Sequence, residues 1–414
     1  MRRIETAVMG AAAAAAGVFL AFGPTHVSDY ARDAGPALHP LVNGDIDAAL
    51  AHQPAMGWFA ILVRAPFVFF VRHGGSLLEY RVGNLPCVLV LVALGIWLAT
   101  DMRRNEASLL AAALVIALAI LSPMNRHALA DGHPEELLGA ALCVIAVLAA
   151  ASGRRPFLAG LVLGLALGTK QWAVLAAGPA LLAAPRGRAQ IAATALALGG
   201  ALTLVPVLAG SHHLLSPASS VSPSTTKAMP ASIWWVIGHA HQVQAPGWSV
   251  EVRTIPLWLA NLTHPLIVAL GVLLPLTLFA RTRRAATRET ALALLALLFL
   301  LRCALDPMTV GYYHVPLLVS LLALEALHRR GPALLALISN AVLWLLVARI
   351  PWDLAPGKVA AIYLTWALPM ACYLVLKVYF PSVISGLGKW PSTSQPSSVT
   401  TTRSSIRTPN SPGT

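Results

Sequence analysis

The chain has 414 residues, of which 57% are apolar and only 11% are charged. Soluble domains are about 45–50% apolar and about 25% charged, so this composition excludes an ordinary cytosolic enzyme. The formal net charge of +13 could suit a nucleic-acid-binding protein. The basic residues, however, stand in short breaks between apolar runs, where they set the orientation of a membrane protein. We therefore expect a multi-pass membrane protein that binds no nucleic acid.

The apolar runs predict the membrane-spanning helices, since about 18 or more apolar residues are enough to cross a bilayer. A first span within residues 1–23 begins with Arg2 and Arg3. The later runs lie at 82–100, 107–122, 134–152, 157–184, 189–209, 256–280, 289–304, 311–327, 332–350 and 358–380.

Two stretches need a different interpretation. The run 157–184 is too long for one span, and we predict two short helices that meet near Gly168 and Lys170. The run 56–71 contains Arg64 and Pro66, and we predict an amphipathic or re-entrant segment. The total is then about 11 to 12 transmembrane helices, an all-α membrane domain over residues 1–380.

Short basic connections at 101–105, 152–156, 185–188, 281–284 and 328–330 alternate with more polar ones at 24–81, 123–133, 210–255, 305–310 and 351–357. The positive-inside rule places the basic connections and the N-terminus in the cytoplasm, with 24–81 and 210–255 as large outer loops. The Ser/Thr/Pro-rich segment 381–414 reads as a disordered cytoplasmic tail. The Ala/Leu/Arg-rich composition fits a GC-rich bacterium, hence its cytoplasmic (plasma) membrane.

Under this topology, polar residues from four distant stretches gather on the outer face, where ionisable groups near a membrane are functional candidates. They are Asp29, Asp33 and Asp45; Arg126, His127, His133, Glu135 and Glu136; Lys170 and Gln171; and Tyr313 and His314. Each group also has a structural interpretation: a solvated acidic loop, a helix N-terminus at 133–136, a snorkelling lysine or an aromatic belt. Because no metal-ligand spacing is present, we expect no metal and no cofactor.

Three of these stretches resemble the GT-C superfamily of polytopic glycosyltransferases, in particular glycosyltransferase family 87. The first is SDYARDAGPALHPLVNG, residues 28–44, which follows the first span. The second is GHPEELLGAAL, residues 132–142, which has His133 and Glu135 where the family usually has Gln and Asn. The third is the Gly-rich helix, lysine and Pro-bearing helix of residues 159–185, and YYHVPLL at 312–318 is also similar.

The resemblance implies a GT-C-like fold and a sugar donor, mannose-like, carried on a polyprenyl phosphate. It implies transfer to a lipid or glycan acceptor of the cell envelope, with membrane lipids around the enzyme. The general base is then Asp29, with Asp33 and Asp45 as the next candidates. Lys170 is the phosphate contact, helped by Arg126 or His314, and the remaining polar residues named above bind substrate.

Two other functions stay open from the sequence. A transporter or flippase for a lipid-linked sugar or a small solute would carry acids near mid-span on broken helices, whereas the acids here lie at the outer ends of the runs. A catalytically lapsed paralogue is compatible with the departures at His133 and Glu135.

Overall fold

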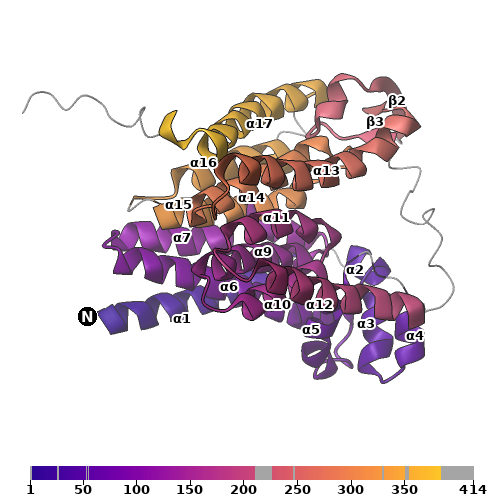
Figure 1. The fold of residues 1–414 in the computed structure, drawn as a ribbon. Helices are drawn as coiled ribbons and strands as arrows, with labels where there is room; N and C mark the ends of the chain where they lie inside the picture. Colours follow the sequence, from indigo (N-terminus) through magenta and orange to yellow (C-terminus); the bar gives the residue numbers. More distant parts are fainter. Residues whose placement is uncertain are drawn as a thin grey trace, which may run out of the picture.

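The computed structural model of the chain describes residues 2–25, 28–52, 54, 56–209, 226–245, 248–328, 331–349 and 354–383. The predicted tail 381–414 lies almost wholly outside these residues, as does the first part of the loop 210–255. The described chain is mainly a bundle of helices. In Figure 1, the N-terminus and the end of α17 (Pro356–Tyr379) lie at one end of the bundle, and α2–α5, β2 and β3 lie at the other.

The first nine of the described helices lie within residues 2–152. They are α1 (Arg2–Ala21), α2 (Ser28–Arg32), α3 (Gly35–Val42), α4 (Ile46–Ala51), α5 (Trp58–Phe69), α6 (Ser76–Arg104), α7 (Leu109–Leu121), α8 (Pro123–Ala130) and α9 (Pro134–Ser152).

The remaining elements complete the bundle and add a small sheet. They are α10 (Pro156–Leu167), the 3₁₀ helix η1 (Gln171–Ala176), α11 (Ala177–Ala183), α12 (Arg188–Ala209), β1 (Lys227–Ala228), η4 (Ile233–Val236), β2 (His239–Ala245), β3 (Trp248–Thr254), α13 (Leu257–Thr282), α14 (Arg288–Leu305), η5 (Gly311–His314), α15 (Val315–His328), α16 (Leu334–Trp344), the π-helical η6 (Leu345–Arg349) and α17.

Within the described residues, five helical segments are long and apolar enough to cross a membrane: 76–104, 109–130, 134–152, 257–282 and 356–379. Shorter apolar helices, such as α5 and α10, pack between or beside them. The helical, multi-pass architecture is therefore confirmed. The count of 11 to 12 spans stays a prediction.

The apolar run 157–184 breaks into two short arms at residues 168–170, between α10 and η1. The second arm returns to the end where α9 finishes, because Arg186 Nε donates a 2.8 Å hydrogen bond to the carbonyl of Gly153. This hairpin (residues 156–183) therefore presents Lys170 at its tip. A 3.0 Å ion pair between Arg103 and Glu5 likewise joins the basic end of α6 to the start of α1.

Helix α5 has 12 residues, a length of about 18 Å that falls short of the roughly 30 Å apolar thickness of a bilayer. This short length supports a re-entrant segment. Its start is tied to the hairpin tip by hydrogen bonds of 2.8 Å from the Gly57 amide to the Thr169 carbonyl and from the Phe59 amide to the Gly168 carbonyl.

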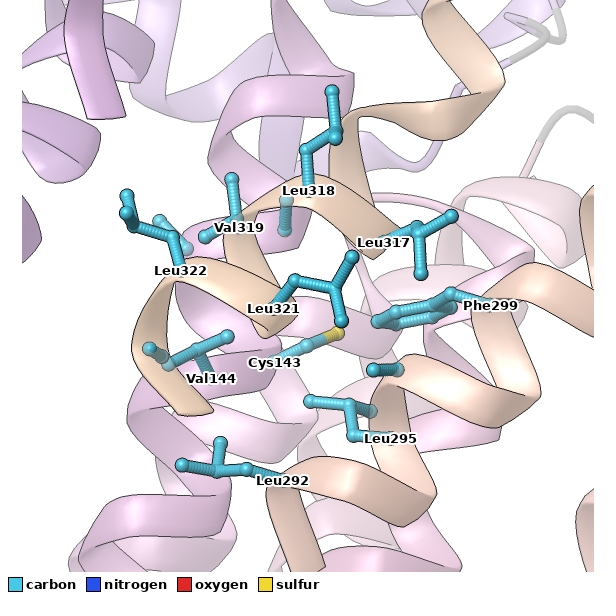
Figure 2. Packing of buried hydrophobic residues seen from close by; sticks show 14 of the residues in the cluster. Cys143, Val144, Leu292, Leu295, Phe299, Leu317, Leu318, Val319, Leu321 and Leu322 are labelled. Atoms are coloured by element: carbon cyan, nitrogen blue, oxygen red, sulfur yellow. The ribbon is translucent and has the colours of Figure 1, made fainter. Parts of the chain in front are cut away.

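The centre of the bundle is a continuous apolar core. Figure 2 shows Cys143 and Val144 of α9 packed among leucines of α14 and α15, with Phe299 beside them. Cys143 is fully buried there and free of disulfide bonds, so it packs as a small hydrophobic residue.

The second half of the loop 210–255 folds into an antiparallel sheet with strand order β1-β3-β2. In β3, residues 250–254 read Val-Glu-Val-Arg-Thr, an alternation of apolar and polar side chains that favours a strand. From the sequence we predict a large outer loop here and no strand.

Candidate active site

Four side chains from three separate parts of the chain form a continuous polar chain at the hairpin-tip end of the bundle. Lys170 Nζ lies 2.9 Å from Oε1 of Glu135, and the same oxygen lies 3.0 Å from Nδ1 of His133. The other ring nitrogen of His133, Nε2, lies 3.5 Å from a carboxylate oxygen of Asp29. We call these four residues the relay. It runs from the exposed carboxylate of Asp29 to the largely sheltered ammonium of Lys170, whose side chain is 14% exposed.

A second group of charges adjoins the relay. Lys170 Nζ is 3.9 Å from Glu136 Oε1, and the other oxygen of Glu136 is 3.9 Å from Arg302 NH1. Trp172 Nε1 donates a 3.1 Å hydrogen bond to Glu136. The guanidinium of Arg302 also lies over the ring of Tyr313, 4.3 Å from its centroid, and donates to the Tyr313 carbonyl at 3.2 Å. Two cations therefore converge on the carboxylate of Glu136.

The turn before α9 explains how these groups meet. Gly132 has φ +95°, in the left-handed region that favours glycine, and a Cβ there would lie 2.9 Å from the Tyr30 amide nitrogen. His133 then stands at the N-cap position with Pro134 in the first turn. Glu135 and Glu136 follow in that turn, fully buried, where the positive end of the helix dipole stabilises carboxylates. The short turn thus brings α2 against the start of α9.

Two groups outside the membrane-spanning segments, His133 and Asp33, have a raised pKa. Burial alone would lower the pKa of His133, but its hydrogen bond to Glu135 and the charge of that residue raise it overall. Burial raises the pKa of Asp33, although His133 and Lys170 oppose the shift. Tyr312 stacks on the imidazole of His133 with 4.3 Å between ring centroids, and this contact fixes the ring plane.

The structure keeps several predicted site residues away from the relay. Asp45 is exposed and caps α4, accepting a 3.0 Å hydrogen bond from the Ala48 amide. Arg126 and Gln171 are exposed at the surface. His127 pairs with Asp131 at 3.4 Å, at the edge of the site, where its ring centroid lies 6.1 Å from that of Tyr312.

His314 is fully buried, and both its ring nitrogens are engaged within the bundle. Nδ1 lies 3.1 Å from the Gly311 carbonyl, and Nε2 lies 3.0 Å from the hydroxyl of Tyr363. These two contacts join η5, between α14 and α15, to α17.

Sequence reasoning missed Arg302 and Trp172. Arg302 stands inside the apolar run 289–304, and its side chain is only 7% exposed. A charged residue within an apolar span is a functional candidate by itself, so the signal was present in the sequence. Trp172 directly follows the hairpin tip, but its hydrogen bond to Glu136 depends on packing that only the fold reveals.

A family model described as glycosyltransferase family 87 matches residues 59–307, more than half of the chain. This segment contains most of the relay and Arg302, whereas Asp29 precedes it. No curated protein and no solved structure matches the chain. Because the match covers more than half of the chain, the chain belongs to glycosyltransferase family 87, as a multi-pass membrane glycosyltransferase with a GT-C-like fold.

Proposed function

We propose that this glycosyltransferase moves a sugar, mannose-like, from a polyprenyl-phosphate donor to a lipid or glycan acceptor. The reaction takes place at the outer face of the bacterial cytoplasmic membrane, with the N-terminus in the cytoplasm. The position of the relay supports this orientation, because it lies at the start of α9, whereas a basic connection follows the end of this helix.

Asp29 acts as the general base. Its carboxylate is the most accessible one of the relay, with 42% of the side chain exposed. It accepts the proton of the acceptor hydroxyl while the acceptor oxygen bonds to the anomeric carbon. The bond from that carbon to the phosphate oxygen breaks in the same step, so a single displacement inverts the configuration. His133, itself held by Glu135, orients the base.

Lys170 and Arg302 stabilise the charge that develops on the departing polyprenyl phosphate. Preorganised cations in a site sheltered from water are effective for this purpose. Without donor, these cations are balanced by Glu135 and Glu136, which holds them in place. Arg302, which lies 3.9 Å from Glu136, supports Lys170 in this role in place of Arg126 or His314.

The connected ion pairs from Asp29 to Lys170 are the observation that carries the proposal. A transporter would place its carboxylates at broken helices near mid-span, whereas here they gather at one end of the bundle. A lapsed paralogue would have no need of a complete relay. His133 and Glu135, which differ from the usual family residues, form its central contact at 3.0 Å.

The test is transfer of labelled sugar from polyprenyl-phosphate donors in membranes, comparing wild type with Asp29→Asn. We expect turnover to fall by about 10²–10⁴-fold, the usual loss for a general base. Asp47→Asn is the matched control, since Asp47 is an exposed acid of the same loop, and it should retain activity. Full turnover of Asp29→Asn would move the base to Asp33, and an inactive wild type with every such donor would refute the donor class.

A further inference from the structure

One buried arginine has no place in the proposed chemistry. Arg64, on α5, is 0% exposed. Its NH1 group lies 3.9 Å from the sulfur of Met56, and its Nε and NH2 groups have no hydrogen-bond partner within the described part of the chain. Burying a cation lowers the stability of a protein unless neighbouring groups compensate the charge. The neighbours of Arg64 therefore indicate why a cation stands there.

Two tyrosine rings provide this compensation. The guanidinium carbon of Arg64 lies 5.3 Å from the ring centroid of Tyr30 and 5.9 Å from that of Tyr80, and the two centroids are 5.1 Å apart. Both rings lie within the roughly 6 Å range of cation–π attraction, which is strongest where water is excluded. Both tyrosines are buried. Arg64 therefore joins α2, which carries Tyr30, to α6, which carries Tyr80.

The packing of Tyr30 determines where Asp29 stands. Helix α2 has only five residues, too few to hold its position through its own hydrogen bonds. Tyr30 directly follows Asp29 in this helix, and its buried ring is the anchor of α2 in the bundle. The contact of Asp29 with His133, at 3.5 Å, is the longest in the relay. The buried ring of Tyr30 is therefore what keeps the exposed carboxylate beside the imidazole.

The same cluster is connected to the other parts of the site. The start of α5 is bound to the hairpin tip at Gly57, and Arg64 stands seven residues later, about 10 Å along the helix. The hydroxyl of Tyr80 donates a hydrogen bond to the carbonyl of Leu129, close to the turn before α9. The cluster of Arg64 and the two tyrosines thus reaches both ends of the relay.

We propose that Arg64 is a positioning residue for the general base, an inference that rests on the role of Asp29 in the proposed function. Arg64 is fully buried and acts through Tyr30. By holding that ring, it fixes the carboxylate of Asp29 relative to Lys170. A general base must come within about 2.6–3.2 Å of the hydroxyl that it deprotonates. A displacement of about 1 Å can lower the rate by about 10²-fold.

The experiment compares sugar transfer in membranes, per folded protein, for wild type, Arg64→Lys, Asp29→Asn and the double variant. Arg64→Lys keeps the charge but removes the extended planar group that reaches both rings, and we expect turnover to fall by about 10–10²-fold. Because Arg64 acts through Asp29, the double variant should be no slower than Asp29→Asn alone. Losses that multiply in the double variant would overturn the proposal. Full turnover of Asp29→Asn would instead refute the base assignment on which it rests.

A pair of substitutions at Tyr30 tests the ring itself. Tyr30→Leu should lose turnover as Arg64→Lys does. Tyr30→Phe should recover most of that loss, because the Tyr30 hydroxyl has no hydrogen-bond partner within the described residues. Equal losses in the two variants would overturn the proposal. Arg72→Lys is the matched control and should retain activity, since the guanidinium of Arg72 lies 4.2 Å from the ring of its near neighbour Phe69.

A measurement of the mobility of α2 does not depend on activity. A nitroxide label is attached to Asp29→Cys, in a chain in which the exposed Cys372 is replaced by serine. We expect the label to be more mobile with Arg64→Lys than with Arg64 in place, and unchanged with Arg72→Lys. Equal mobility with and without Arg64 would overturn the proposal, even if every donor tested gave no turnover.

Discussion

The ion pair between Lys170 and Glu135 can be tested by removing its charges singly and together. Lys170 Nζ lies 2.9 Å from Glu135 Oε1 and 3.9 Å from Glu136 Oε1. With an effective dielectric constant of about 20, these distances correspond to attractions of about 6 and about 4 kcal/mol before desolvation. Glu135→Gln therefore removes the larger attraction and leaves the smaller one. We expect a loss of about 3 kcal/mol, the lower end of the range for breaking a buried pair.

The double variant Glu135→Gln/Lys170→Met removes both charges. Replacing a buried ion pair by neutral groups of similar volume is often nearly neutral for stability, so most of the loss should be recovered. Thermal unfolding in detergent, followed by tryptophan fluorescence, should show a Tm lowered by about 5 °C for Glu135→Gln. The double variant should unfold close to the wild-type temperature.

Transfer activity separates the structural role of this pair from its chemical role. The double variant lacks the cation proposed to stabilise the leaving phosphate, so its turnover should stay about 10²–10³-fold low, as in Lys170→Met alone. Recovered turnover in the double variant would exclude Lys170 as the phosphate contact. An unfolding temperature as low as that of Glu135→Gln would show that the two side chains do not act as a stabilising pair.

Two further predictions concern the relay and the hairpin tip. The pKa of His133 is raised in the folded protein, so its protonated form stabilises the fold. The excess stability of wild type over His133→Gln should therefore be complete below about pH 6.5, the ordinary histidine value, and should fall as the pH rises through the raised pKa. Unfolding temperatures measured across this pH range check this, and a difference that grows with pH would contradict it. Gly57→Ala should lower the free energy of unfolding by about 2–3 kcal/mol, because the new Cβ would lie 2.1 Å from the Gly168 carbonyl oxygen, which cannot rotate away. Gly10→Ala, which has open space around the added Cβ, is the control and should unfold like wild type. Equal unfolding temperatures for the two variants would show that α5 does not depend on this contact.

Much of the architecture follows from local patterns that the sequence displays directly. The lengths of the apolar runs determine which segments can enter a bilayer, and the 28-residue run 157–184 had to break because its two flanks are both basic. The structure places the break at residues 168–170. Asp29, His133 and Lys170 were candidates for the same reason, since polar groups at the ends of spans stand out against an apolar background.

The composition of the site, by contrast, depends on packing between helices that are distant in the sequence. Arg302 joins the site because α14 packs against α9, whereas Asp45 caps its own short helix and His314 bonds to Tyr363. The hydropathy of the sequence indicates whether a residue lies inside an apolar run or at its end. It does not indicate the direction in which the side chain points around the helix axis. That direction is set by contacts among neighbouring helices, so the tertiary structure alone decided which charged groups meet.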